Sequence, residues 1–205
     1  MSDASNQYDI KLGMYLGELQ LPFEESLAAA RDLGAQYVWC GAHSDNRALF
    51  ELSDTEIDEA ARLVDAHGLK FFFIDSGGMF KQVHLAELEK GRMLEHAQFK
   101  QHFDRLTRSM AVSSRLGVGA VSCSSFAWPA EYTAGKPTWP MRWYTKGGVI
   151  SEADMEKLVV MLSPAVDAAE QHGVDLVFSQ EPWIYTNTTV NFRRVAEQLG
   201  SSRVK

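Results

Sequence analysis

The stretch SPAVDAAEQHGVDLVFSQEPW, Ser163 to Trp183, contains the two patterns from which the fold is predicted. Its apolar residues recur at helical spacing up to Gly173, and glycine is typical of the residue at which a helix ends. A short apolar run, Val174 to Gln180, follows at once and has the length of a buried strand. The stretch therefore predicts a helix that leads into a strand, with Glu181 at the strand's end.

The same unit recurs along the chain. Strand-length apolar runs alternate with helical patterns, and the runs lie near residues 10–16, 37–41, 69–76, 119–125 and 174–180, with the start of a sixth at 203–205. Strands this apolar, alternating with helices, are typical of a parallel sheet that helices cover. We expect a polar N-terminal tail over residues 1–9, and one α/β domain with right-handed crossovers over residues 10–205.

Two architectures fit this alternation: an open doubly wound sheet and a (β/α)8 barrel. A doubly wound nucleotide-binding domain often carries GxGxxG between its first strand and helix, but Gly17 stands alone in that turn. Gly77 and Gly78 form a turn without that spacing, and no GK[ST] triplet occurs. The sequence therefore gives no signal for a bound nucleotide.

Composition limits the partners. The 205 residues are 45% hydrophobic and carry a formal net charge of −7, so the chain has no electrostatic reason to bind nucleic acid or an anionic membrane. No window reaches the ~18 apolar residues of a membrane helix, and the N-terminus does not resemble a signal peptide. Cys40 and Cys123 lie in apolar runs and are predicted to be core thiols of a cytoplasmic protein. A disulfide between them, or a reactive thiol, is the alternative.

Two long segments carry a family resemblance. The segment KLGMYLGELQLPFEESLAAARDLGAQYVW, residues 11–39, resembles the opening of the sugar phosphate isomerase/epimerase family, which has the xylose isomerase-like TIM barrel. The stretch that ends at Trp183 is similar to the family's fifth unit, and NTTVNFRRVAEQLGSSRVK, residues 187–205, looks like the helix that leads into its sixth strand. The resemblance implies a (β/α)8 TIM-barrel fold, of which residues 10–205 supply about five and a half β/α units.

The resemblance also implies a chemistry. Members of this family use a divalent metal ion, here Mn, Mg, Co or Zn, to polarise a carbonyl or hydroxyl of a small sugar, sugar phosphate or polyol. A carboxylate moves a proton on the adjacent carbon. The family's metal-binding glutamate at the end of the fifth strand aligns with Ser179, which is a poor ligand for such a cation. Glu181 is two residues further on and is expected on the same strand face, so it could replace that ligand. Alternatively, the metal site is degraded.

Candidate site residues are those expected after the carboxyl ends of the strands, where TIM-barrel active sites lie. Asp75 could be a second metal ligand, although capping the Gly77–Gly78 turn is the favoured role. The predicted set is Glu181 as catalytic residue; His43, Trp128, Trp183 and Asn187 as substrate-binding residues; and Glu181 with Asp75 as metal ligands.

The other histidines and tryptophans are not predicted to be catalytic or metal-binding residues. His84 lies in a helix-like stretch and is expected at the surface, whereas His67 and His172 precede helix-ending glycines and are expected to be structural. The long segment 126–148 is rich in tryptophan, with Trp139 and Trp143 besides Trp128, and is interpreted as a lid over a small sugar or as a surface for a second subunit.

Three functional readings remain open. The first is a sugar isomerase or epimerase, and the second is a non-catalytic fragment that lacks the C-terminal ligand strands of the family. The third, a metal-dependent endonuclease-like relative, is disfavoured by the acidic charge. On the second reading, an incomplete barrel would expose strand edges, so we expect aggregation or a homo-oligomer, and weak or no metal binding.

Overall fold

The computed structural model describes residues 12–40, 47–77, 80–128 and 148–205. Its centre is a five-stranded sheet in the order β1-β2-β3-β4-β5, and every neighbouring pair is parallel. The strands are β1 Gly13–Tyr15, β2 Tyr37–Cys40, β3 Lys70–Ile74, β4 Ala120–Cys123 and β5 Asp175–Phe178. The parallel α/β fold predicted from the sequence is confirmed, with strands shorter than the apolar runs.

The last residues of the chain continue the sheet beyond β5. Val204 forms a parallel bridge with Leu176, and the Leu176 N–H donates to the Arg203 carbonyl oxygen at 2.7 Å. The expected start of a sixth strand is therefore present. Strand order equals chain order, as it does around a (β/α) barrel.

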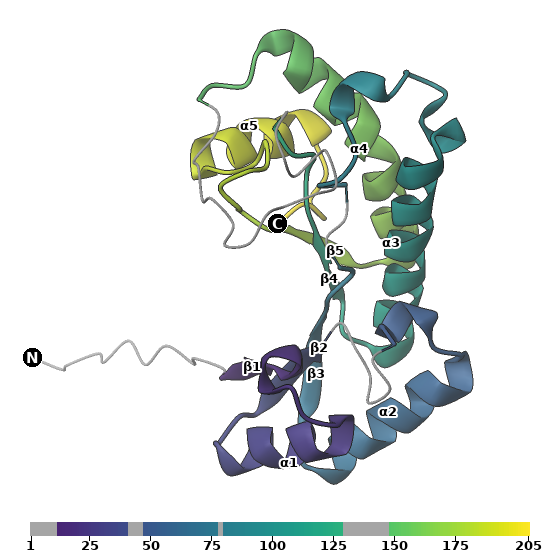
Figure 1. Cartoon of the computed structure of the whole chain (residues 1–205), viewed down its shortest axis with the longest axis vertical. Coiled ribbons are helices and arrows are strands. Elements are labelled where there is room, and N and C mark those ends of the chain that lie inside the picture. The colour runs from purple at the N-terminus through teal and green to yellow at the C-terminus, as the bar shows by residue number, and fades with distance from the viewer. Residues whose placement is uncertain (1–11, 41–46, 78–79, 129–147) are drawn as a thin grey trace, which may run out of the picture.

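A helix follows every strand. The α-helices are α1 Phe23–Asp32, α2 Asp54–Ala66, α3 Ala97–Leu116, α4 Glu152–His172 and α5 Thr189–Leu199, and short 3-10 helices are η1 Leu16–Leu19, η2 Leu49–Glu51, η3 Leu85–Glu87 and η4 Met93–Glu95. In Figure 1, α2, α3 and α4 run along one side of the column of strands, with α1 near one end and α5 near the other. Gly173 ends α4 at a φ of 69°, the left-handed conformation that the sequence pattern predicted.

The two faces of the sheet are covered unequally. Side chains that face the helices, such as Val38, Ile74 and Leu176, are fully buried. Of the side chains that alternate with them, Trp39, Phe73 and Val177 are only half-buried. Phe72, which lies at an irregularity in the register of β2 and β3, is 42% exposed. The apolar runs predict strands buried on both faces, and this prediction is wrong for the described residues, because the second face is only partly buried. The physical reason is that the described sheet is open, since β1 and β5 are not neighbours.

Candidate active site

The predicted site residues that the structure describes follow the carboxyl ends of β3, β4 and β5. Glu181 follows β5, and its carboxylate forms an ion pair with the ammonium of Lys81, which follows β3. Their side chains are 21% and 12% exposed, respectively, so the pair is largely removed from water. Sequence reasoning missed Lys81. The available signal was a lysine four residues after Gly77, close behind the third strand.

Asp75 makes several hydrogen bonds at the end of β3. Its carboxylate accepts from the Gly77 N–H at 3.0 Å, which is the turn-capping bond expected from the sequence. It also accepts from the Ser122 hydroxyl of β4 at 2.8 Å. Burial, together with the Asp75 charge, raises the pKa of Tyr15. Asp75 therefore ties the end of β3 to β4.

The backbone after β5 differs from the expectation. The strand ends at Phe178, so Ser179 and Glu181 lie in irregular chain. Glu181 therefore does not share a strand face with Ser179, and that prediction is wrong. The Ser179 N–H still donates to the Cys123 carbonyl oxygen at 2.9 Å, but the chain then turns, and the Ile184 N–H donates to the Glu181 carbonyl oxygen at 3.2 Å.

A cavity of about 600 Å³ lies at the same edge of the sheet. Its lining comes from the segments after β3, β4 and β5 and from the first turns of α4: His84, Leu85, Ala86, Ala127, Trp128, Ala153, Asp154, Lys157 and Tyr185. The Trp128 and Tyr185 rings are 4.1 Å apart and form an aromatic wall. Burial is the main cause that raises the pKa of Tyr185 to about 12, so its hydroxyl stays protonated at neutral pH.

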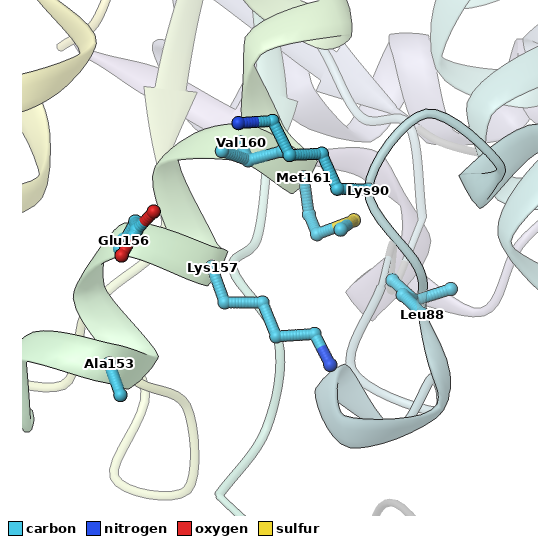
Figure 2. A pocket seen from close by; sticks show the side chains of 7 residues that line it. All are labelled: Leu88, Lys90, Ala153, Glu156, Lys157, Val160 and Met161. Carbon is cyan, nitrogen blue, oxygen red and sulfur yellow. The ribbon is translucent and has the colours of Figure 1, made fainter.

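His84 belongs to this cavity, contrary to the sequence prediction. It lies in an extended conformation just before η3, is half-buried and lines the cavity. A smaller cavity of about 330 Å³ lies alongside and shares Ala153 and Lys157 with the first. Figure 2 shows Lys157 extending from α4 towards the loop that carries Leu88, and its ammonium donates to the Ala86 carbonyl oxygen at 3.0 Å.

The remaining predicted substrate-binding residues are not brought into one cluster. The Trp183 carbonyl oxygen accepts from the Trp128 N–H at 2.9 Å, but Trp183 does not line the large cavity. Asn187 accepts from the Asn191 side chain at 3.1 Å, close to the start of α5. His43, Trp139 and Trp143 lie outside the described residues.

The donors in the described part of the chain do not suit a divalent cation. No group of three or more His, Cys, Asp or Glu side chains comes together there. The two predicted ligands are both engaged, Asp75 by two hydrogen-bond donors and Glu181 by Lys81. Because such a cation needs several oxygen or nitrogen ligands at ~2.0–2.6 Å, the predicted pair alone does not provide a metal site.

Cys40 and Cys123 are free and buried, as expected of core thiols. Burial raises the pKa of each to about 12, which leaves little thiolate at pH 8. We expect Ellman's reagent at pH 8 to label both thiols at least ~100-fold more slowly in the folded chain than in urea. Each thiol favours folding below its ordinary pKa of ~8.5, and this contribution is lost as the pH rises towards 12. Rapid labelling of the folded chain would contradict this burial.

The comparisons with known proteins agree with this architecture. The family model described as "Xylose isomerase-like TIM barrel" matches residues 27–205. This chain therefore belongs to the xylose isomerase-like TIM barrel family. The family resemblance inferred from the sequence is confirmed, and so is the (β/α)-barrel fold class. None of the curated protein sequences matches the chain.

Solved structures of the same fold include two sugar epimerases. The 3-keto-D-glucoside 4-epimerase of E. coli is 13% identical, with a TM-score of 0.64, and the match covers 96% of this chain and 66% of that one. The D-psicose 3-epimerase of Clostridium cellulolyticum, solved with D-tagatose, is 18% identical, with a TM-score of 0.64, and the match covers 96% and 62%.

A third similar structure contains a metal. The xylose isomerase-like TIM barrel protein of Mycobacterium smegmatis, solved in complex with magnesium, is 17% identical, with a TM-score of 0.62, and the match covers 95% of this chain and 62% of that one. The present chain thus spans about two thirds or less of these three structures. Within its described segments, no helix has the length and hydropathy of a membrane span.

Proposed function

We propose that this chain takes part in the isomerisation or epimerisation of a small sugar or polyol. The observation that carries the proposal is the Lys81–Glu181 pair, a largely buried carboxylate and ammonium after the carboxyl ends of β3 and β5. In TIM barrels this end of the strands is where active sites lie. The family membership and the two structurally similar epimerases support the choice of substrate class.

In the proposed reaction Glu181 transfers the proton. Its carboxylate accepts a proton from the carbon next to the substrate carbonyl, and the electron pair of the broken C–H bond moves to give an enediolate. The Lys81 ammonium, held against the same carboxylate, would donate a hydrogen bond to the oxygen on which negative charge develops. Return of the proton by Glu181 to the neighbouring carbon gives isomerisation, whereas epimerisation requires a second acid that donates a proton to the same carbon from the other face.

The large cavity is the proposed binding place for the rest of the substrate. Its volume of about 600 Å³ falls within the usual range for small-molecule sites. The Trp128–Tyr185 wall offers an apolar surface for a sugar ring, while His84, Asp154 and Lys157 offer polar contacts for hydroxyl groups. The buried Trp128 indole N–H has no acceptor among the described residues, which suits a site that takes a ligand oxygen.

A divalent metal ion was expected from the family resemblance, and one similar structure was solved with magnesium. The described donors do not fit such an ion, because the carboxylates of Asp75 and Glu181 are already engaged. The proposed proton transfer is therefore assigned to Glu181 and Lys81.

A deuterium-exchange experiment tests the function. The protein is incubated in D₂O with D-fructose, D-tagatose or D-psicose, and proton NMR follows the hydrogen on the carbon next to the carbonyl. We expect enzyme-dependent loss of that signal for at least one sugar, because proton abstraction exposes the intermediate to solvent. Sugar binding without exchange would instead support the non-catalytic reading, which the absence of a three-ligand cluster in the described residues favours.

A further inference from the structure

Lys81 is held in place by buried neighbours. The residue before it, Phe80, is fully buried and stacks on Phe99 and Phe126 at ring-centroid distances of 5.0 and 5.2 Å. The Val83 N–H donates to the Phe80 carbonyl oxygen at 2.9 Å, and Val83 is also fully buried. The backbone that carries Lys81 is therefore anchored in the core on both sides, although it follows a turn.

Glu181 is anchored in a similar way. Its carbonyl oxygen accepts from Ile184, which is fully buried and forms an antiparallel bridge with Ala127 after β4. The two charged side chains thus extend from separate fixed segments, after β3 and β5, and meet in a largely buried place. Because neither backbone is an exposed loop tip, their pairing is set by the packing of the fold.

The pair has a consequence for cation binding. In the described segments, Lys81 is the one cationic side chain within ion-pair distance of Glu181. A divalent cation bound by Glu181 would have to displace this ammonium or lie beside it. Displacement would leave the Lys81 ammonium unpaired in a largely buried place, which is costly. A cation bound beside the ammonium would be repelled by it, because like charges repel strongly where water is excluded.

We infer that the Lys81 ammonium occupies the place beside Glu181 that a divalent cation would take, so that lysine and metal compete for one carboxylate. Lys81 is thereby a positioning residue for Glu181, and its charge supplies the positive potential of the proposed site. The competition follows from the ion pair itself. Only the use of Lys81 in the reaction rests on the proposed function.

Manganese titration tests the competition. Isothermal titration calorimetry with MnCl₂ is carried out on the whole chain and on four variants: Lys81→Met, Lys81→Arg, Glu181→Gln and the double variant Lys81→Met/Glu181→Gln. We expect the unaltered chain, Lys81→Arg and Glu181→Gln to bind Mn²⁺ equally weakly. Lys81→Met should bind at least ~10-fold more tightly, since methionine keeps the bulk of the lysine stem and removes its charge. The double variant should lose this gain.

Two results would overturn the inference. One is tight Mn²⁺ binding by the unaltered chain that Glu181→Gln abolishes, because the metal would then occupy Glu181 despite Lys81. The other is a Lys81→Met variant that binds Mn²⁺ no more tightly than the unaltered chain. Neither titration result measures hydrogen exchange of a sugar, and a lack of sugar exchange does not measure competition between Lys81 and a metal. The proposed function and this inference can therefore fail separately.

Thermal unfolding without metal gives a second readout for the same variants. If Lys81 and Glu181 pair in solution, each single neutral variant leaves one charge buried without its partner and should lower the melting temperature by several degrees. The double variant should recover much of that loss, because it leaves no unpaired charge. Strictly additive losses would show that the two side chains do not pair, and the inference would be wrong. This readout remains informative if Lys81→Met is too unstable for calorimetry.

Discussion

Replacing Phe80 by alanine is expected to lower the free energy of unfolding by about 3–5 kcal/mol. The ring has no exposed surface and stacks between Phe99 of α3 and Phe126 after β4. These contacts join the segment after β3 to the rest of the core, so alanine would leave a cavity that rigid neighbours cannot fill. Urea unfolding followed by far-ultraviolet circular dichroism measures the loss.

Phe72→Ala is the matched control, because it removes the same atoms from a side chain that is 42% exposed on the inner face of the sheet. Its effect should be about half as large or less, since the ring keeps much of its contact with water when folded. Equal losses for the two variants would contradict the difference in burial. A Phe80→Ala loss below about 1 kcal/mol would show that the segment after β3 is not anchored by this ring.

The conformation of the segment around Phe80 could not be predicted from the sequence. The segment MFKQVHLAELEK has helical spacing of apolar residues, and His84 was therefore placed on a surface helix. In the structure, Phe80 has a φ of 34° and His84 is extended, and only the 3-10 helix η3 forms from Leu85. Burial of Phe80 and Val83 in the core thus outweighs local helical preference, which is weak over so few residues. Periodicity alone could not reveal this, because the partner rings come from α3 and from the segment after β4.

The repeating β/α units were predictable because their sequence signals are local. A glycine follows each α-helix within two residues, such as Gly173 after α4, and after α1 to α4 an apolar run comes soon after it, so both signals lie within a few residues of each other. The Asp75–Gly77 turn was predictable on the same local grounds. The Lys81–Glu181 pair joins residues 100 positions apart through two irregular segments, and no local pattern specifies where such segments meet. The cavity beside Trp128 and Tyr185 escaped prediction for the same reason.

Glu181→Gln is expected to reduce deuterium exchange of the responsive sugar by at least ~100-fold. The amide cannot accept the substrate proton, and positioned general bases contribute typically 10²–10⁴-fold. The same NMR assay in D₂O measures the change. Glu59→Gln is the matched control, because it removes one carboxylate from α2, where the side chain is 61% exposed and pairs with Arg62 at 3.5 Å. It should leave the exchange rate unchanged.

Glu181→Asp separates the loss of the base from the loss of the ion pair. Aspartate keeps the carboxylate but shortens its reach by one methylene, so exchange should fall by less than in Glu181→Gln, because the proton acceptor is retained but misplaced. Addition of MnCl₂ should not restore either variant if Glu181 acts as a base beside Lys81. Full exchange activity in Glu181→Gln would remove Glu181 from the reaction. The proton acceptor would then be sought among the other acidic side chains at the carboxyl ends of the strands, beginning with Asp154 in the cavity.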